Sequence, residues 1–519
     1  MKLECLRRIL SEELSVQEIN SFANPKSISE QTAEKGQTVI TGISFDSRTV
    51  EKGHIFVAVT GVVANGHEYI PSAVEKGAAA VICEELEAFT KYTKLYPDID
   101  FYLVKSARRA LAIASAEFYD HACDSLHIIG ITGTKGKTST SFMIQRILKE
   151  SGLRCGIIGT NGAYFEDFYE EMEHSTPESR DLHRLFSEMK KRGATHVVME
   201  VSSQALMMFR VFGITYDTAI FTNITPDHIG TGEHKDFEEY LFYKGKLFSM
   251  CKNAVINLDS DKSEYILDIC RENNVGVTTF ACGNENADYK AKDEKFFIDK
   301  GMKTKYTITG KDDLCDEIEV SVPGSFSVFN SLCAASTALS MGISIDCIKN
   351  ALLDVKVVGR IEPVHDPRLK VPVIIDYAHN AVSLESLFTA VKAYSPKRMI
   401  CVFGCGGNRS KLRRYEMGEI SGKYADISII TTDNSRFEEL DDIISDILIG
   451  MKKTDGKYEI VKDRHEAIFR AIDIALPGDI VLLAGKGQET YLDIKGVKTH
   501  FDERDAVKEY CELADKRKQ

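Results

Sequence analysis

The feature that most constrains the chain is a glycine-rich stretch between an apolar run and a helical run. Residues 130–139 read Gly-Ile-Thr-Gly-Thr-Lys-Gly-Lys-Thr-Ser. The apolar, β-branched run 127–131 predicts a buried parallel strand, and residues 138–150 predict a helix. A loop of this kind binds phosphate, because its backbone N–H groups and the helix N-terminus attract phosphate oxygens. The commonest such pattern has glycine where Ile131 stands, so a loop that only connects strand and helix is the alternative.

Length, charge and cysteine usage narrow the class of protein. The 519 residues suit about three domains. The net charge of −13 argues against nucleic acid as the main partner, since a phosphate backbone needs a basic face. No apolar run approaches the length of a membrane span, and the N-terminus lacks a signal-peptide core. The 13 cysteines are scattered without metal-ligand spacing, which favours a reducing cytoplasm.

The order of strand-like and helical segments predicts three α/β domains. Residues 1–106 form a small N-terminal domain of short strands punctuated by glycines. Residues 107–358 alternate strands and helices, which predicts a central ATPase domain of the P-loop type with a mostly parallel sheet. Within it, the polar, strand-like segment 283–325 predicts a small β addition. A second alternation over residues 359–519 predicts a doubly wound, Rossmann-like domain.

Polar side chains follow two apolar strands of the central domain. Glu200 ends the first of these runs, and His228 lies beyond the second. Together with the hydroxyls of Thr138 and Ser139, they could complete a Mg²⁺ shell around the phosphates of ATP. The alternatives are a helix cap or surface salt bridge for Glu200, and a structural hydrogen bond for His228.

The third domain carries four polar clusters, each at the predicted carboxyl end of a parallel strand. They span residues 376–380, 404–409, 432–436 and 485–489. Such ends meet at one rim of an open sheet, so the clusters should converge. Two arginines and a glutamate there could hold an amino acid, because arginine binds carboxylates bidentately and glutamate binds an ammonium group. Ordinary glycine-rich turns are the alternative.

Together these motifs resemble the Mur ligase family, most closely its E-type branch. The resemblance runs from Asp46-Ser47-Arg48 to Phe501-Asp502 and so covers nearly the whole chain. It implies that the first domain holds a UDP-sugar, the central domain ATP, and the third the incoming amino acid. The E-type branch adds the third peptide residue to the peptidoglycan precursor.

The resemblance also implies a ligand for each group of site residues. For ATP these are Gly133, Thr134, Lys135, Gly136, Lys137, Thr138, Ser139, Asn330, Arg360, Asp376 and His379. For the UDP-sugar-dipeptide they are Ser47, Ser175, Thr176, Ser202 and Arg210. For the amino acid they are Arg409, Asp433, Asn434, Arg436, Gly485 and Glu489.

The metal ligands and the catalytic residues follow from the same resemblance. The implied Mg²⁺ ligands are Thr138, Ser139, Glu200, His228 and Lys244. Lys244 would act as a carbamate formed with CO₂, which would help to hold a second Mg²⁺ ion. The implied catalytic residues are Lys137, Glu200, His228 and Lys244. Without the resemblance, Lys244 would be interpreted as a solvated lysine on a helix.

Several positions depart from the family's motifs. Gln204 and Gln488 each stand where the family has histidine, and the segment 227–234 resembles that of cyanophycin-type ligases. Ser435 replaces the proline of Asp-Asn-Pro-Arg, the wording typical for meso-diaminopimelate, while Arg436 remains. Arg436 would bind the distal carboxylate that L-lysine lacks, and a buried arginine without its partner is costly. Diaminopimelate is therefore favoured, with lysine, ornithine or another amine still open.

The predicted activity is ADP-forming amide ligation in peptidoglycan precursor synthesis. ATP would phosphorylate the γ-carboxylate of UDP-N-acetylmuramoyl-L-alanyl-D-glutamate, and a free diamino acid would attack the acyl phosphate. We expect a cytoplasmic monomer that binds neither nucleic acid nor membrane. The alternatives are a related Mur-family ligase or paralogue with another acceptor or amine, and a P-loop ATPase that forms no product bond.

Overall fold

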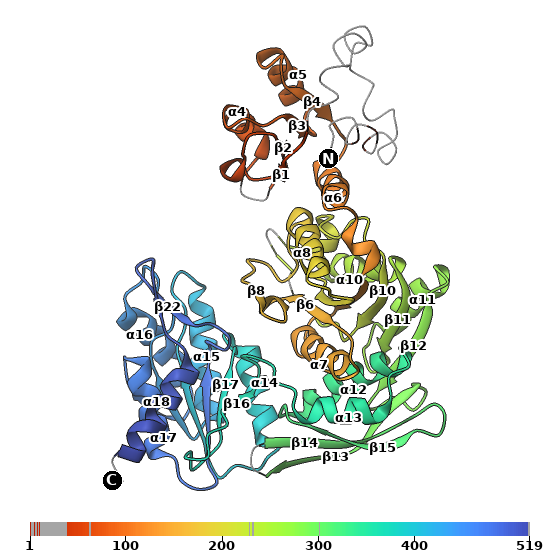
Figure 1. Cartoon of the computed structure of the whole chain (residues 1–519). Coiled ribbons are helices and arrows are strands. Elements are labelled where there is room, and N and C mark those ends of the chain that lie inside the picture. The colour runs from red at the N-terminus through yellow and green to blue at the C-terminus, as the bar shows by residue number, and fades with distance from the viewer. Residues whose placement is uncertain are drawn as a thin grey trace. The chain divides into compact units, whose positions relative to one another are not determined.

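The computed structural model describes residues 1, 5, 8, 10, 39–61, 64–227, 229–230, 233–299 and 302–516. The chain divides into two compact units, which are described separately. The first comprises Met1–Lys137 with Gly152–Thr278, and the second Thr138–Ser151 with Thr279–Gln519. Both contain parallel sheets covered by helices (Figure 1), which confirms the predicted α/β class. The predicted domain boundaries at residues 106 and 358 stay predictions.

The first unit begins with a small four-stranded parallel sheet. Its order is β1-β2-β3-β4, with the bounds β1 (Gly42–Ser44), β2 (His54–Val57), β3 (Ala80–Cys83) and β4 (Asp100–Leu103). One face packs against α6 (Ala107–Phe118), and the other packs against α4 (Ile70–Glu75) and α5 (Leu86–Leu95). Between β1 and β2 lies the short helix η1 (Ser47–Thr49), and η2 (Gly66–Tyr69) precedes α4.

The rest of the first unit is built on a parallel sheet with the order β11-β10-β5-β9-β6. The strands are β5 (His127–Thr132), β6 (Cys155–Gly159), β9 (His196–Glu200), β10 (Tyr216–Phe221) and β11 (Cys251–Asn257). An antiparallel hairpin of β7 (Gly162–Phe165) and β8 (Phe168–Glu170) extends the edge beside β6.

Helices cover this sheet and hold its core. They are η3 (Ala122–Ser125), α8 (Ser179–Lys191), α9 (Ser203–Met207), α10 (Phe237–Gly245), η4 (Lys246–Ser249) and α11 (Ser263–Glu272). Alternate strand residues such as Ile128, Val197 and Met199 pack with Leu185 and Phe186 of α8. Alternate side chains of the predicted strands therefore point into this core.

The second unit starts with α7 (Lys137–Glu150), whose first residue belongs to the first unit. Strand β12 (Gly276–Ala281) crosses the division, and its end pairs with an antiparallel meander. The meander contains β13 (Tyr289–Ile298), β14 (Met302–Gly310) and β15 (Cys315–Val320). It confirms the β structure predicted for residues 283–325. Helices α12 (Ser325–Ser340) and α13 (Ile345–Leu353) follow.

The C-terminal part of the second unit is a six-stranded sheet with the order β16-β17-β21-β18-β19-β20. The parallel strands are β17 (Val373–Asp376), β18 (Met399–Phe403), β19 (Ile427–Ile430), β20 (Lys457–Ile460) and β21 (Ile480–Ala484). Only β16 (Glu362–Pro363) pairs antiparallel within this sheet. A separate hairpin joins β22 (Tyr491–Ile494) to β23 (Val497–His500).

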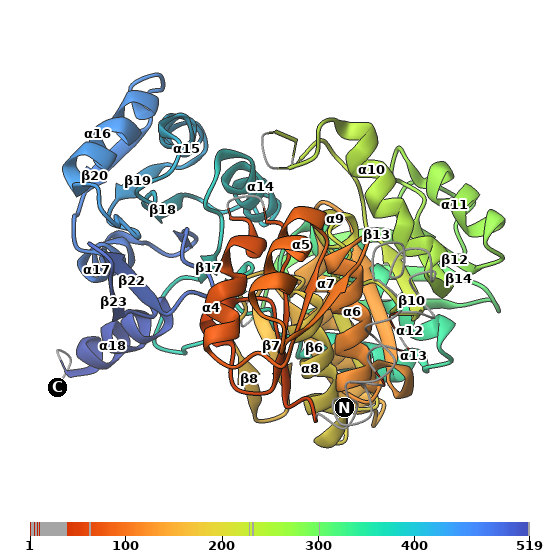
Figure 2. The ribbon, with the colours of Figure 1, turned by 90° about the horizontal axis from the view of Figure 1, so that it is seen from above.

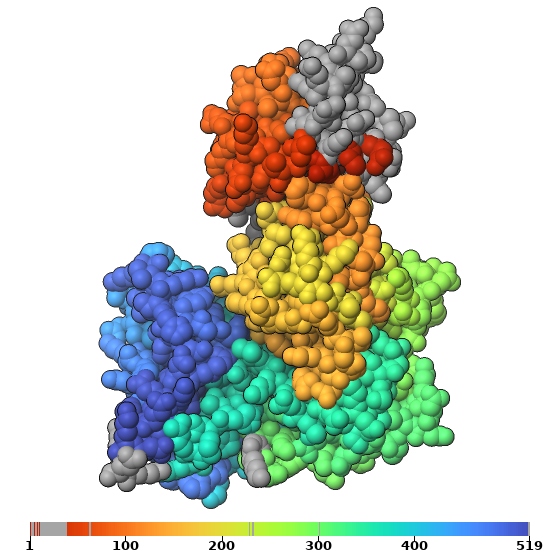
Figure 3. Space-filling model, in the orientation of Figure 1, coloured from red at the N-terminus to blue at the C-terminus, as the bar shows by residue number. Residues whose placement is uncertain are grey.

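Helices cover both faces of this sheet, as a doubly wound fold requires. One face carries α14 (Ala381–Lys392), α15 (Lys411–Tyr424) and α16 (Leu440–Met451), and the other carries α17 (Arg464–Ile474) and α18 (Glu503–Lys516). Figure 2 shows strands β18–β20 between these two sets of helices, and Figure 3 shows the packed surface that this part (blue) presents. Ile374 and Leu482 face the first set, whereas Val373 and Val481 face the second. The predicted Rossmann-like domain is confirmed.

None of the helices among the described residues is long and apolar enough to cross a bilayer.

Candidate functional site

The predicted phosphate loop has a backbone that only glycine can adopt at its first turn. Gly133 has a φ of 151°, and a Cβ at this residue would overlap Oγ1 of Thr222. The loop is held by the segment after β10, because N–H of Thr134 donates to the carbonyl of Asn223 over 3.0 Å and N–H of Lys135 to Asn223 Oδ1 over 2.9 Å. The strand, loop and helix therefore fit a nucleotide phosphate site.

Two lysine side chains converge on one carbonyl oxygen of this loop. Lys137 Nζ donates to the carbonyl of Gly133 over 2.8 Å, and Lys244 Nζ donates to the same oxygen over 2.9 Å. Lys244 lies in α10 and is only 2% exposed. Burial, with a smaller effect from the charge of Lys137, lowers the pKa of Lys244 well below its usual value. The interpretation of Lys244 as a solvated lysine, which the residues alone favoured, is therefore wrong.

Tyr240 joins α10 to the phosphate loop. Its hydroxyl lies 3.0 Å from Oγ1 of Thr134, and its ring centroid lies 4.6 Å from Lys244 Nζ. Oγ1 of Thr134 in turn donates to the carbonyl of Thr225 over 3.2 Å. The sequence assigned Tyr240 no role, although its spacing of four residues from Lys244 places both on one helix face.

Glu200 ends β9 as a buried carboxylate with two donors. It is 1% exposed and accepts hydrogen bonds of 3.0 Å from both N–H and Oγ1 of Thr160. Oγ1 of Thr176 donates to the Glu200 carbonyl over 2.9 Å and accepts from N–H of Ser202 over 3.0 Å. Oγ of Ser202 caps α9. The structure thus brings together Glu200, Thr176 and Ser202.

Arg210 joins the same cluster. Its Nη1 donates to the carbonyl of Thr176 over 3.1 Å, and its Nε lies 3.0 Å from Glu178 Oε1. Ser175, the neighbour of Thr176, is half-buried. Ser47 lies in η1 beside the N-terminal sheet and is 9% exposed. His228 lies outside the described residues.

The remaining predicted nucleotide residues belong to the second unit. Thr138 and Ser139 lie buried in the first turn of α7. One turn along this helix, Oγ1 of Thr140 lies 3.5 Å from Oδ1 of Asn330, which is buried in α12. The structure therefore places Asn330 close to the start of the helix that follows the phosphate loop.

Asp376, Arg360 and His379 gather at the end of β17. Asp376 accepts from N–H of Ile361 over 2.7 Å and of Ala378 over 2.8 Å. Burial raises the pKa of Asp376, and the nearby charge of Arg360 partly offsets this. The guanidinium of Arg360 lies 5.2 Å from the ring centroid of Tyr377, and Nδ1 of His379 lies 2.9 Å from the Tyr377 carbonyl oxygen. These predicted neighbours thus share one edge of the C-terminal sheet.

The clusters after β19 and β21 meet in a charged network. Oδ1 of Asn434 accepts from Lys486 Nζ over 3.0 Å, and Nδ2 of Asn434 donates to Glu489 Oε2 over 2.8 Å. Lys486 also donates to Glu489 Oε2 over 2.8 Å and lies 3.9 Å from Asp433. A Cβ at Gly485 would lie 2.8 Å from Asp433 Oδ2, so this residue borders the network.

The cluster after β18 reaches the same loop. Nη1 of Arg436 donates to the carbonyl of Gly407 over 3.1 Å. A Cβ at Gly407 would overlap the carbonyl oxygen of Ser435, so the two loops touch through their backbones. Arg436 has a φ of 50°, and its N–H donates to the carbonyl of Asp493 over 2.9 Å. Arg409 lies on the same loop as Gly407 and is exposed.

Beneath these loops lies an ion pair that sequence analysis missed. Arg464 and Glu503 are both fully buried, with 2.7 Å between Nη2 and Oε1. Arg464 also donates to the carbonyls of Thr432 and Ala484, over 3.0 and 2.8 Å. These residues directly precede Asp433 and Gly485. Arg464 begins one helix and Glu503 another, 39 residues apart, so no local pattern could have revealed the pair.

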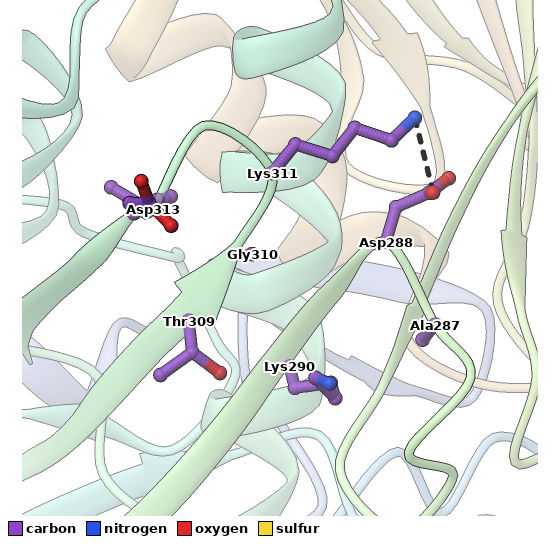
Figure 4. A pocket seen from close by; sticks show the side chains of 8 residues that line it. Ala287, Asp288, Lys290, Thr309, Gly310, Lys311 and Asp313 are labelled. Carbon is purple, nitrogen blue, oxygen red and sulfur yellow. Dashed lines mark ion pairs between the residues drawn. The ribbon is translucent and has the colours of Figure 1, made fainter.

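One surface hollow of the second unit is lined by other residues. It measures about 500 Å³ and is open to solvent at the start of β13 and the end of β14, where Lys311 pairs with Asp288 over 3.0 Å (Figure 4). None of the predicted site residues lines it. Among the described residues, no three His, Cys, Asp or Glu side chains gather as a metal cluster.

Comparison with known proteins identifies three matching family models. "Mur ligase family, catalytic domain" matches residues 39–119, "Mur ligase middle domain" residues 131–338, and "Mur ligase, glutamate ligase domain" residues 359–487. The UDP-N-acetylmuramoyl-L-alanyl-D-glutamate–2,6-diaminopimelate ligase of Clostridium perfringens (strain 13 / Type A) is 40% identical, over 92% of this chain and 96% of its own. The enzyme of the same name from Caldanaerobacter subterraneus is 39% identical, over 92% and 96%.

Solved structures give the same result. A UDP-N-acetylmuramoyl-L-alanyl-D-glutamate–2,6-diaminopimelate ligase aligns with a TM-score of 0.68 and 27% identity, covering 93% of this chain and 97% of its own. The MurF ligase of Thermotoga maritima in complex with ADP aligns with a TM-score of 0.57 at 18% identity, covering 92% and 98%. This second likeness concerns the fold alone.

The glycine at the phosphate loop provides a direct test of the nucleotide site. Gly133→Ala should abolish binding of a fluorescent ATP analogue, because its Cβ would force the loop away from Thr222. Gly152→Ala is the matched control, since Gly152 also has a positive φ (84°) but its Cβ would meet open space. We expect the control to lose about 1 kcal/mol of stability and to keep nucleotide affinity. Unchanged binding in Gly133→Ala would contradict the assignment.

Proposed function

The chain belongs to the Mur ligase family and is an ATP-dependent ligase, and we propose that it joins meso-diaminopimelate to UDP-N-acetylmuramoyl-L-alanyl-D-glutamate. The observation that carries this proposal is the 40% identity, over nearly the full length of both chains, to an enzyme named for that reaction. Arg436, at the edge of the network formed by Asn434, Lys486 and Glu489, supports the choice of amine.

In the proposed reaction, a γ-carboxylate oxygen of the D-glutamyl end attacks the γ-phosphorus of ATP and ADP leaves. The amine then attacks the acyl phosphate, and phosphate leaves from the tetrahedral intermediate. The loop from Gly133 to Ser139 would bind the ATP phosphates, and Lys137 would offset their charge. Asn330, Arg360, Asp376 and His379 would contact the rest of the nucleotide, while Ser47, Ser175, Thr176, Ser202 and Arg210 would hold the UDP-sugar-dipeptide.

Mg²⁺ would stabilise the negative charge that develops on the transferred phosphoryl group. Its proposed ligands are the hydroxyls of Thr138 and Ser139, the Glu200 carboxylate, His228 and a carbamate on Lys244. The buried position of Lys244 supports the last of these, because burial lowers its pKa and so favours the uncharged amine, which is the form that attacks CO₂. The product is a carbamate anion and a released proton. This change would replace the amine beside Lys137 with an anion that can bind metal.

The amine substrate would lie against the loops that follow β18, β19 and β21. We assign its distal carboxylate to Arg436, with Arg409, Asp433, Asn434, Gly485 and Glu489 lining the remainder. Glu489 would accept the ammonium group of the amino acid. The thirteen cysteines, all free thiols, support an enzyme of the reducing cytoplasm, and we expect it to be monomeric.

A second candidate function is ligation of another amine or another acceptor by a Mur-family paralogue. Gln204, Gln488 and Ser435, which stand where the family's motifs have His, His and Pro, favour it. An assay of ADP release with different amines separates the two candidates.

The proposed reaction predicts that ADP release depends on both co-substrates. With ATP, Mg²⁺ and UDP-N-acetylmuramoyl-L-alanyl-D-glutamate present, meso-diaminopimelate should increase coupled ADP production at least tenfold more than L-lysine or L-ornithine. A different preferred amine would favour the paralogue. ADP release that continues without acceptor and amine would contradict a ligase and indicate a simple ATPase.

Arg436 provides a test of amine recognition. Arg436→Ala should raise the KM for diaminopimelate by about 10–100-fold, the cost of about 1.4–2.7 kcal/mol expected for a lost charged hydrogen bond. The KM for ATP should change less than twofold. Arg470→Ala is the matched control, because Arg470 pairs with Glu459 on the surface of the same part of the chain. Equal increases in both KM values for Arg436→Ala would remove its proposed role.

Carbamylation of Lys244 can be measured directly. After incubation with ¹³C-bicarbonate, the protein should give a carbamate carbon signal in the NMR spectrum, and Lys244→Ala should lack it. The activity of this variant should fall about 10–100-fold or more, as expected when support for a metal is lost. In Lys246→Ala, the control two residues away, the signal should persist, because Lys246 lies over the rings of Phe242 and Tyr243 instead. A signal retained in Lys244→Ala would place the carbamate elsewhere.

A further inference from the structure

We propose that Lys486 is a positioning residue that fixes the orientation of the Asn434 amide and the Glu489 carboxylate for the amine substrate. This inference rests on the proposed function of the loops after β19 and β21. Lys486 is fully buried, which is unusual for a lysine and requires compensating partners. Its Nζ lies 3.0 Å from Asn434 Oδ1 and 2.8 Å from Glu489 Oε2.

The network determines which way the Asn434 amide points. Oδ1 accepts two hydrogen bonds, from Lys486 Nζ and, over 2.9 Å, from N–H of Asp493. An ammonium group has only donors, so it can satisfy the amide oxygen and not the amide nitrogen. Nδ2 is thereby directed toward Glu489 Oε2, 2.8 Å away. Without Lys486, the amide loses the stronger of the two donors that hold its oxygen in place.

The same lysine fixes the carboxylate of Glu489. The hydrogen bonds from Lys486 and Asn434 both end on Oε2. Among the described residues, no hydrogen bond to Oε1 is formed, and the side chain keeps 19% of its surface exposed. Lys486 therefore holds one oxygen of the carboxylate and leaves the other to face an incoming ammonium group.

Charge balance leads to the same conclusion. Two carboxylates, Asp433 and Glu489, lie within 3.9 Å of the single ammonium of Lys486. The group carries one net negative charge, so it attracts one further cation in a partly buried setting. Lys486 thus neutralises one of the two carboxylate charges and leaves the other for a single ammonium group. Without the Lys486 ammonium, the two carboxylates would repel each other.

The experiment compares Lys486→Met, Lys486→Gln and a control, Lys498→Met, by the KM values for the amine and for ATP. Lys498 is exposed but lies 4.2 Å from the ring centroid of Tyr491, which Lys486 approaches to 5.1 Å, so it controls for the loss of that ring contact. We expect Lys486→Met to raise the KM for the preferred amine at least tenfold and that for ATP less than twofold. Lys486→Gln, which keeps an N–H donor without the charge, should give an intermediate value. Lys498→Met should match the wild type.

A double-mutant cycle with Glu489→Gln separates positioning from a purely structural role. If Lys486 acts through Glu489, Lys486→Met should raise the amine KM much less in the Glu489→Gln background than alone. Equal effects in both backgrounds, or parallel losses for amine and ATP in soluble, folded Lys486→Gln, would overturn the inference. If the wild-type protein releases ADP without any amine, the proposed function is overturned as well. If the wild type requires the amine but the Lys486 variants raise the KM values for amine and ATP equally, only the role of Lys486 is overturned.

Discussion

The buried ion pair of Arg464 and Glu503 supports the geometry of the C-terminal loops. Arg464 satisfies the carbonyls at the ends of two parallel strands, directly before Asp433 and Gly485. Breaking one partner of such a pair costs about 3–5 kcal/mol, because an uncompensated charge stays buried. The loops that follow can then be short and polar, since the positions where they leave the sheet are already fixed. The network around Lys486 is built on this base.

The first unit solves a different electrostatic problem. Its phosphate loop gathers two lysines, Lys137 and Lys244, on the carbonyl of Gly133. Two ammonium groups that share one acceptor repel each other, and burial further disfavours the charged form of Lys244. Such an arrangement suits a site that binds an anion or loses one positive charge by chemical modification. The glycine backbone and the two lysines thus both favour the binding of a negatively charged group at this loop.

The elements with strong local signals were predictable from the sequence. Apolar runs such as 373–375 and 480–484 pack on both faces of a parallel sheet, because every side chain in them is buried. The clusters at the ends of these strands could be expected to converge. The network of Asn434, Lys486 and Glu489, together with the contact between Gly407 and Ser435, confirms this for three of them. The apolar run before the glycine-rich stretch at 130–139 and the helical run after it likewise predicted the strand, the loop and the helix.

The parts that sequence analysis missed depend on contacts between distant residues. The hairpins β7–β8 and β22–β23 are short and partly polar, so their pairing energy comes from neighbours rather than from pattern. The burial of Lys244 results from the packing of α10 against the loop, and Lys486 has no local feature that separates it from a surface lysine. The roles of individual site residues, His228 included, follow from the family resemblance and stay predictions.

The close contact between Gly407 and Ser435 makes substitutions at these two residues differ in their structural effect. Ser435 meets Gly407 through its carbonyl oxygen, which every amino acid possesses, so this contact does not depend on which side chain stands at 435. Any side chain at 407 would push the loops apart and carry Arg436 with them. Substitution at 435 is therefore limited by the space around a buried side chain, whereas substitution at 407 is limited by the backbone of the neighbouring loop.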